Sequence, residues 1–337
     1  MIKKIFFFLL TTFSFSGLKA QDIHFTQFNV NPMLLNPANV GFINCDYRLT
    51  AQYKNQWRSI TVPFVTYASS AELRLMKGAG QRNALGFGLL MDNDRAGDSK
   101  LSQTQVGFDA AYTKSLDPFG IQYFGLGVLG SINLLQMDRA GVTFDDQFNL
   151  NTTYITPASA EIFNQNTSFF DVSAGAQYYY TPDKSHSFNA GFAMYHIPQP
   201  ARSFTGDASS VLKRKFVFNL SGMTKISNKM ELYPKLQISL QDPHREVVFG
   251  SFLRMDLDKK ISNSKYGAYF GAWYRLGDAI SPVIRIDIDK LSFGMSYDIT
   301  MSKLIRLSDA RSGPEFSIIY VGCIQGVKKT QMFCPRF

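Results

Sequence analysis

The chain has 337 residues, of which 45% are hydrophobic, 14% aromatic and 18% charged, and its formal net charge is +9. Disordered chains lack aromatic residues and coiled coils are dominated by Ala, Glu, Lys and Leu, so this composition excludes both classes. The mean hydropathy of -0.09 excludes a bundle of apolar membrane helices, each of which needs about 20 apolar residues. A membrane β-barrel stays open, because its strands alternate between lipid-facing and lumen-facing side chains.

The first 20 residues have the three parts of a secretory signal peptide. Lys3 and Lys4 precede an apolar run over 5–15, and small residues follow up to Ala20. The apolar run is too short for a transmembrane helix. We expect cleavage after Ala20, which also removes Lys19 and leaves a net charge of 9 − 3 = +6.

Residues 21–45 do not follow a strand pattern. They contain the dipeptides Asn31-Pro32 and Asn36-Pro37, and Asn before Pro initiates turns. Phe, Met and Leu side chains are mixed with Asn throughout. We expect a folded irregular segment or a short helix that precedes the first strand of a barrel and plugs its lumen.

From residue 46 onward, apolar residues alternate with polar ones, as in 284–289, where three Ile residues alternate with Arg and Asp. This period of two indicates a sheet with one apolar and one polar face. Most of the runs have about 10 to 14 residues, whereas soluble strands average five or six and a tilted strand across a bilayer needs about nine to eleven. The pattern predicts about fourteen strands, at 46–57, 62–75, 84–93, 104–115, 120–133, 169–182, 185–196, 214–225, 229–240, 245–258, 264–275, 280–287, 290–300 and 313–322.

The connections between these strands alternate in length. Those after odd-numbered strands include gaps of about 35 and 17 residues, whereas those after even-numbered strands are short. Bacterial outer-membrane barrels have the same arrangement of short periplasmic turns and longer outer loops. The fold class predicted is all-β, a transmembrane up-and-down barrel of about 14 antiparallel strands over 46–322, followed by a C-terminal tail over 323–337.

Two soluble folds are the alternatives. A β-sandwich has shorter strands with Greek-key connections, and a lipocalin-like barrel has eight strands around an apolar interior. A fourteen-strand barrel is too wide to be filled by its own side chains, so a polar interior is expected.

The alternation also predicts which face each side chain occupies. We expect lipid to face Tyr47, Leu49, Phe108, Leu236, Ile238, Met295 and Tyr297. We expect the lumen to contain Arg48, Lys54, Asp109, Lys235, Arg285, Asp287 and Asp298. Since both signs of charge occur there, ion pairs across the lumen are expected rather than a pore selective for one sign.

Three cysteines, Cys45, Cys323 and Cys334, leave an odd thiol in an exported chain. Cys323 and Cys334 close a loop of about ten residues, so the sequence favours a disulfide between them and a buried thiol at Cys45. No pair has zinc-finger spacing.

No pattern of catalytic, cofactor-binding or metal-binding residues is found, so we expect neither enzyme activity nor a cofactor. The four histidines, His24, His186, His196 and His244, lack metal-ligand spacing and are interpreted as isolated polar or turn residues. An acidic run at 92–98 lacks the closing Glu of a calcium loop.

Neither the paired glycines within strands nor the basic cluster of the sequence indicates a functional site. Gly86-Phe-Gly88 and Gly125-Leu-Gly127 lie inside predicted strands, where Gly marks a bend or tight packing. The densest basic cluster, 213–215, is too small for a nucleic-acid interface, so no nucleic-acid partner is expected.

The two longest connections, near 134–168 and 197–213, fall at the same end of the predicted barrel. Long loops on a rigid scaffold commonly carry function, and exposed apolar patches commonly bind partners. The alternative is that the first loop folds into the barrel mouth and buries its own apolar side chains. The candidate partner residues in that loop are Phe144, Phe148, Tyr154, Ile155, Ile162 and Phe163.

Five motifs follow one another along nearly the whole mature chain: Gln21 to Gly41, Tyr53-Lys-Asn-Gln-Trp57, Gly86 to Gly97, Phe144-Asp-Asp-Gln147 and Cys334-Pro-Arg-Phe337. Together they resemble the PorP/SprF family, outer-membrane proteins of the type IX secretion system and gliding machinery of Bacteroidota. Ile23 stands where many relatives have Pro.

This resemblance implies a fourteen-strand barrel in outer-membrane lipid that helps secrete or attach to the cell surface a cargo adhesin with a C-terminal sorting domain. The implied periplasmic partners are an OmpA-like peptidoglycan-binding protein and other type IX secretion components. Asn36-Pro37-Ala38 also resembles the motif of FadL-type barrels, where it lies in a lumen plug. The alternative function is therefore a FadL-like outer-membrane channel for a hydrophobic small molecule.

Overall fold

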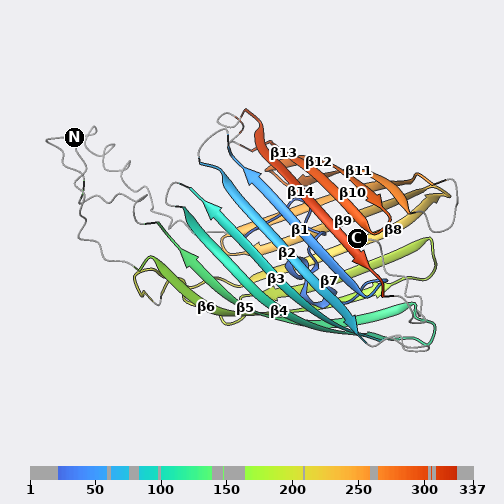
Figure 1. Cartoon of the computed structure of the whole chain (residues 1–337), viewed down its shortest axis with the longest axis horizontal. Coiled ribbons are helices and arrows are strands. Elements are labelled where there is room, and N and C mark those ends of the chain that lie inside the picture. The colour runs from blue at the N-terminus through green and yellow to red at the C-terminus, as the bar shows by residue number, and fades with distance from the viewer. Residues whose placement is uncertain are drawn as a thin grey trace, which may run out of the picture.

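The computed structural model describes residues 22–58, 62–75, 83–97, 100–138, 147, 164–207, 209–258, 265–302, 305 and 309–324. Its described strands close into one antiparallel barrel (Figure 1). The strands are β1 Tyr47–Gln56, β2 Phe64–Leu75, β3 Ala84–Ala96, β4 Leu101–Ser115, β5 Gln122–Gln136, β6 Asn166–Tyr180, β7 His186–Tyr195, β8 Lys215–Ser227, β9 Met230–Gln241, β10 His244–Asp256, β11 Tyr266–Arg275, β12 Ala279–Ile288, β13 Leu291–Thr300 and β14 Arg311–Gly322.

Each strand pairs with its neighbours in sequence, and β1 pairs with β14 to close the barrel. The predicted up-and-down barrel is thus confirmed. The largest shifts from the predicted bounds are at β3, β4, β5 and β6, whose ends extend to Ala96, Leu101, Gln136 and Asn166. The extensions of β3, β4 and β6 are mainly polar, and that of β5 has two adjacent leucines, so all four lack the alternation from which the strands were predicted.

Alternate side chains face in opposite directions, with the predicted phase. Leu49, Phe108 and Met295 are 45%, 53% and 50% exposed on the outer surface. Lys54 and Asp298, in contrast, are each 1% exposed and lie inside. A lysine or arginine facing lipid at mid-bilayer costs about 2–4 kcal/mol, which explains why the charged rows face the lumen.

The two ends of the barrel differ. We call the end where β1 begins and β14 ends the closure end, and the opposite end the long-loop end. The long-loop end carries the connections over 137–165, 196–214 and 301–310, whereas the closure end carries shorter turns such as 228–229 and 289–290. By the rule that short turns face the periplasm, the long-loop end faces outward.

A disulfide joins Cys45 to Cys323 at the closure end, and their Cα atoms are 4.7 Å apart. The predicted pairing of Cys323 with Cys334 is therefore wrong. The reason is the closure ladder: Tyr47 pairs with Gly322, so the residues just outside both strands are brought together. Cys334 lies outside the described residues.

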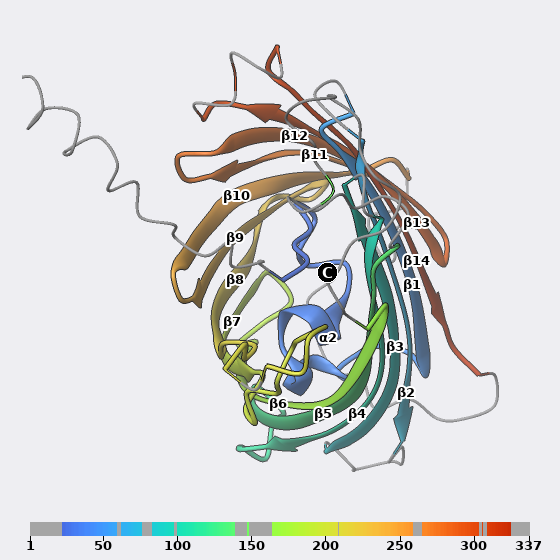
Figure 2. The same ribbon diagram turned by 90° about the vertical axis from the view of Figure 1, so that its left-hand side faces the viewer.

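The N-terminal segment, residues 22–44, is enclosed by the ring of strands (Figure 2). It contains two short helices, α2 Pro32–Leu35 and η1 Pro37–Asn39. Each begins with an Asn cap followed by Pro, an arrangement that favours a helix start because Pro is pre-set for the first helical position. Among the described residues, no helix has the length and apolar character needed to cross a bilayer.

Candidate functional site

Asn36 fixes the middle of the N-terminal segment to the barrel wall. Its side-chain oxygen accepts a hydrogen bond from the Ala38 backbone N–H at 3.0 Å. Its amide nitrogen donates to the Ala176 carbonyl of β6 at 3.0 Å and to Gln177 Oε1 at 3.1 Å. Longer contacts reach the Phe192 carbonyl of β7 at 3.3 Å and an Asn side chain of β8 at 3.4 Å. One fully buried side chain therefore connects the segment to three strands.

Pro37 and Ala38 complete this motif and lie against strand glycines. A Cβ atom placed on Gly127 would lie 2.5 Å from the carbonyl of Pro37, which is closer than real Cβ atoms approach a backbone atom. Gly86 meets the backbone of Val40 in the same way. The prediction that strand glycines mark tight packing is confirmed: they leave room for the backbone of the segment.

The segment also provides the lumen with an apolar core. Phe28 packs against Trp273 of β11 with ring centroids 5.2 Å apart, and Met33 is fully buried in the same cluster. Nearer the closure end, Phe42 stacks on Tyr179 of β6 at 3.8 Å. The expectation of a simply polar interior is therefore incomplete, because inward apolar side chains on many strands pack against the segment.

A polar anchor binds the segment to β13 and β14. Glu315 of β14 accepts hydrogen bonds from the backbone N–H groups of Thr26 at 2.7 Å and Gln27 at 2.9 Å. The Thr26 hydroxyl donates to Asp298 of β13 at 2.7 Å. Asp298 also lies 3.0 Å from Arg275 of β11. Backbone and side-chain groups that would otherwise be buried without partners are thus satisfied by the barrel wall.

The described lumen charges form ion pairs along the wall. Lys54 lies 3.6 Å from Asp298, with one strand between them, and Arg285 lies 3.0 Å from Asp287 on its own strand. Arg48 pairs with Glu72 of the adjacent strand. The predicted mixing of signs is confirmed, but these partners lie on the same or nearby strands instead of across the lumen, because the N-terminal segment occupies the space between.

The beginning of the segment is held at the long-loop end. Asp22 lies 2.7 Å from His196 Nε2 and 3.5 Å from Lys215 Nζ, and the other ring nitrogen of His196 lies 2.7 Å from Asp171 of β6. Burial alone would lower the pKa of His196, but the charge of Asp22 and the hydrogen bonds to both carboxylates raise it to about 9. Burial opposes ionisation of Asp22, yet His196 and Lys215 hold its pKa well below the ordinary value.

The interpretation of all four histidines as isolated is wrong for His196. The pairing of β6 with β7 brings Asp171 beside His196, and the path of the N-terminal segment brings Asp22 to both, so no local spacing could have indicated the cluster. His186 pairs with Asp183 at 3.0 Å in an exposed turn, as expected for a turn residue. Within the described ranges, no group of three or more His, Cys, Asp or Glu residues is arranged to hold a metal ion.

The predicted partner loop cannot be placed. The residues named for it, Phe144, Phe148, Tyr154, Ile155, Ile162 and Phe163, lie outside the described residues. The second long connection, 196–214, is described except for residue 208, and lines a cavity of about 460 Å³ at the long-loop end. The structure therefore provides one defined surface feature at the predicted partner end.

A closed barrel with an apolar outer face, a largely polar wall inside and two unequal ends is an outer-membrane β-barrel. The family model for "Type IX secretion system membrane protein PorP/SprF" matches residues 17–320. The chain belongs to this PorP/SprF family of outer-membrane proteins, which is a family of secretion-system membrane barrels and not of enzymes.

Solved structures show a similar fold at low sequence identity. The Ralstonia pickettii toluene transporter TbuX is 12% identical, with 86% of this chain and 92% of that chain covered and a TM-score of 0.52. The TodX monoaromatic hydrocarbon channel deltaS2 mutant is 9% identical, with 86% and 93% covered and a TM-score of 0.50. These identities establish the fold alone. No curated protein matches the sequence.

Proposed function

We propose that this protein helps secrete a cargo adhesin bearing a C-terminal sorting domain, or anchors it at the cell surface, and that its N-terminal segment is a plug. Membership of the type IX secretion family supports the secretion role. The observation that carries the proposal is the occupied lumen: Asn36 is fully buried and bonded to several strands, and the segment around it is packed among apolar wall residues. A barrel filled in this way suits a docking platform better than an open pore.

The two ends suit different partners. The long-loop end faces outward, where a secreted adhesin would be held, and long loops on rigid scaffolds commonly bind partners. The apolar residues of 144–163 stay the predicted cargo contact. The closure end, with its short turns, is the face available to an OmpA-like peptidoglycan-binding protein and to other secretion components in the periplasm.

The test is deletion of the gene, followed by comparison of surface-bound and released proteins. Loss of one large adhesin from the surface is expected. Complementation with a variant whose residues 150–165 are replaced by a short Gly/Ser linker should restore the barrel but leave the adhesin in the medium. The matched control replaces 261–264, at the closure end, and should retain the adhesin.

Unchanged adhesin secretion and surface retention in the deletion strain would overturn the proposed function. Retention by the 150–165 variant would instead exclude the outer loop as the docking site and direct attention to the closure end.

The alternative, a channel for a hydrophobic small molecule, is a different class of function. The fold likeness to TbuX does not by itself favour it. In planar bilayers, the intact protein should show little conductance while residues 22–44 are present. Large, stable open channels would contradict the plug and favour the channel.

A further inference from the structure

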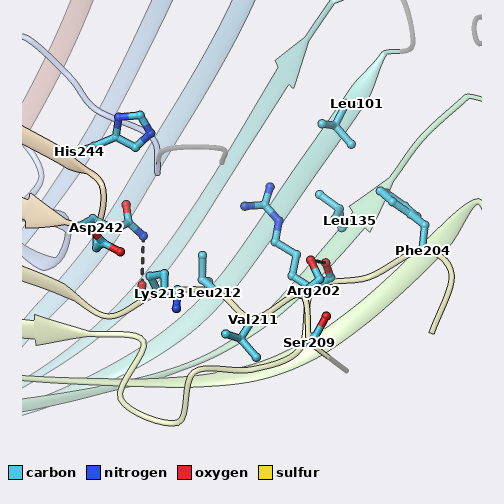
Figure 3. A pocket seen from close by; sticks show the side chains of 12 residues that line it. Leu101, Leu135, Arg202, Phe204, Ser209, Val211, Leu212, Lys213, Asp242 and His244 are labelled. Carbon is cyan, nitrogen blue, oxygen red and sulfur yellow. Dashed lines mark hydrogen bonds between the residues drawn. The ribbon is translucent and has the colours of Figure 1, made fainter. Parts of the chain in front are cut away.

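The cavity at the long-loop end lies among elements that are distant in sequence (Figure 3). The connection between β7 and β8 forms one wall, the turn between β9 and β10 a second, and the outer ends of β4 and β5 a third. Its volume of about 460 Å³ falls in the range of small-ligand sites, roughly 300–1,000 Å³. Leu135 of β5 and Gln241 of β9, which line the cavity, are buried inward-facing side chains, so the cavity lies on the lumen side of the wall.

The three consecutive basic residues 213–215 have different surroundings at this cavity. Arg214 donates from Nε to the Ile197 carbonyl at 3.1 Å, and Lys215 pairs with Asp22 at 3.5 Å. Lys213, in contrast, lines the cavity and makes no ion pair with any described residue. The basic cluster in the sequence thus supplies one brace, one anchor for the plug and one cation directed to the cavity wall.

Arg202 supplies a second cation. Figure 3 shows its guanidinium directed into the space between the strand-end leucines and Lys213. In the part of the chain that the structure describes, this guanidinium makes no ion pair within 4.0 Å. Burial lowers its pKa, and the more distant charges of Asp22 and Asp94 partly offset that effect. Asp242 is the one carboxylate among the lining residues, so the two cations exceed the acidic charge of the wall.

The rest of the lining is largely apolar. Leu101 and Leu135 contribute from the ends of β4 and β5, and Phe204 and Val211 contribute from the β7–β8 connection. A ligand that satisfies both halves carries an anionic group attached directly to an apolar group. A bare inorganic anion would leave the apolar half empty.

We propose that this cavity binds the free C-terminal carboxylate of an extended polypeptide whose last side chain is apolar. At a chain end, the carboxylate and the terminal side chain are attached to the same carbon, which matches the short distance between the cationic and apolar walls. Arginine binds a carboxylate through two parallel hydrogen bonds, and capture of chain termini is a recurrent form of peptide recognition. This proposal rests on the proposed function, because the secreted cargo is the polypeptide expected at this end.

The test measures peptide binding to the purified full-length protein in nanodiscs by fluorescence anisotropy. The probe is a labelled hexapeptide that ends in Leu with a free carboxylate, and its C-terminal amide is the first comparison. The amide and the Arg202→Gln variant should each raise the dissociation constant about ten-fold or more, since hydrogen bonds between charged groups are among the stronger ones. The matched control is Arg245→Gln, which removes the same charge from an exposed position outside the cavity lining and should leave binding unchanged.

A second variant tests the apolar wall without changing charge. Phe204→Ser should weaken the Leu-ended peptide several-fold but change an Ala-ended peptide little. Its backbone contact with Asn164 uses the carbonyl oxygen, so the substitution leaves that hydrogen bond in place.

The proposal would be overturned if the free-carboxylate peptide and its amide bound equally, or if Arg202→Gln and Arg245→Gln weakened peptide binding equally. It would also be overturned by a short free fatty acid that displaces the peptide at equal concentration, because the site would then select a carboxylate on any apolar body. If peptide binding fails while gene deletion still releases the adhesin, the proposed function stands and the terminal-carboxylate site does not. If the peptide binds but deletion has no effect on the adhesin, the site stands and the secretion role does not.

Discussion

Replacing Asn36 with Ala should loosen the N-terminal segment from the barrel wall. The side chain makes three hydrogen bonds of 3.1 Å or shorter, to the Ala38 N–H, the Ala176 carbonyl and Gln177. Two of these bonds join the segment to β6, and a typical intramolecular hydrogen bond contributes about 1 kcal/mol net, so their loss lowers the free energy of docking by about 2 kcal/mol. Because about 1.4 kcal/mol is a ten-fold change in an equilibrium constant, the undocked population should rise roughly thirty-fold.

A cysteine reporter in the lumen measures this population. Thr113 is 1% exposed, its hydroxyl has no hydrogen-bond partner, and it lies beside Gly125, which faces the Ala38 carbonyl. In a Thr113→Cys, Cys334→Ser background, a membrane-impermeant maleimide should label the reporter slowly. If labelling proceeds through local undocking, its rate should rise by the same factor of roughly thirty when Asn36→Ala is added.

The matched control is Asn55→Ala, which makes the same chemical change at an outward position of β1. Asn55 donates to the Tyr53 hydroxyl at 3.1 Å and has no contact with the segment. The control should label as slowly as the parent. An unchanged labelling rate in Asn36→Ala, in a barrel that heat-modified gel mobility shows to be folded, would refute the reasoning that this side chain holds the N-terminal segment in place.

Three further predictions follow from the same structure. Gly127→Val should also speed reporter labelling, because overpacking typically costs about 1–3 kcal/mol, whereas Gly130→Val, which faces outward, should not. The stabilisation from His196 should be complete below its ordinary pKa of 6.5 and be lost as pH rises toward about 9, so the melting temperature should fall over that range, and Asp22→Asn should flatten the profile. Cys45→Ser should lower the barrel's unfolding free energy by about 2–5 kcal/mol, measured by thermal melting without reductant.

Much of the barrel could be predicted because its information is local. Alternation of polar and apolar residues predicts both the strand and the face of the sheet on which each of its side chains lies. Once the alternation is recognised, every side chain in the strand is assigned to the lumen or to the outer surface. The inward positions of Lys54 and Asp298 follow from this rule alone. The strand ends were less accurate because residues near Asn166 are polar on both faces and Leu134 and Leu135 are apolar on both, and either arrangement removes the alternation.

The site could be predicted only in part, because its contacts connect distant segments. The strand glycines indicated close packing, but nothing in the sequence said that Pro37 would lie against Gly127. The predicted disulfide was wrong for the same reason. Sequence distance favoured Cys334 as the partner of Cys323, whereas the β1–β14 ladder brings Cys45 to Cys323 across a separation of 278 residues. The resemblance to known families indicated the Asn36 motif, but the hydrogen-bond partners of Asn36 could be identified only in the folded structure.

The path of the N-terminal segment places Asp22 and the end of β14 at opposite ends of the barrel. An even number of strands returns the chain to the side from which it started, so β1 begins and β14 ends at the same end. The segment adds one further crossing inside the lumen: Ile43 contacts Arg74 near the closure end, whereas Asp22 lies beside His196 and Gln241 at the opposite end. A tag placed before Asp22 would thus be displayed on the outer face while one placed after Gly322 would stay in the periplasm. The ladder between β1 and β14 therefore closes the wall around a segment that runs the length of the lumen.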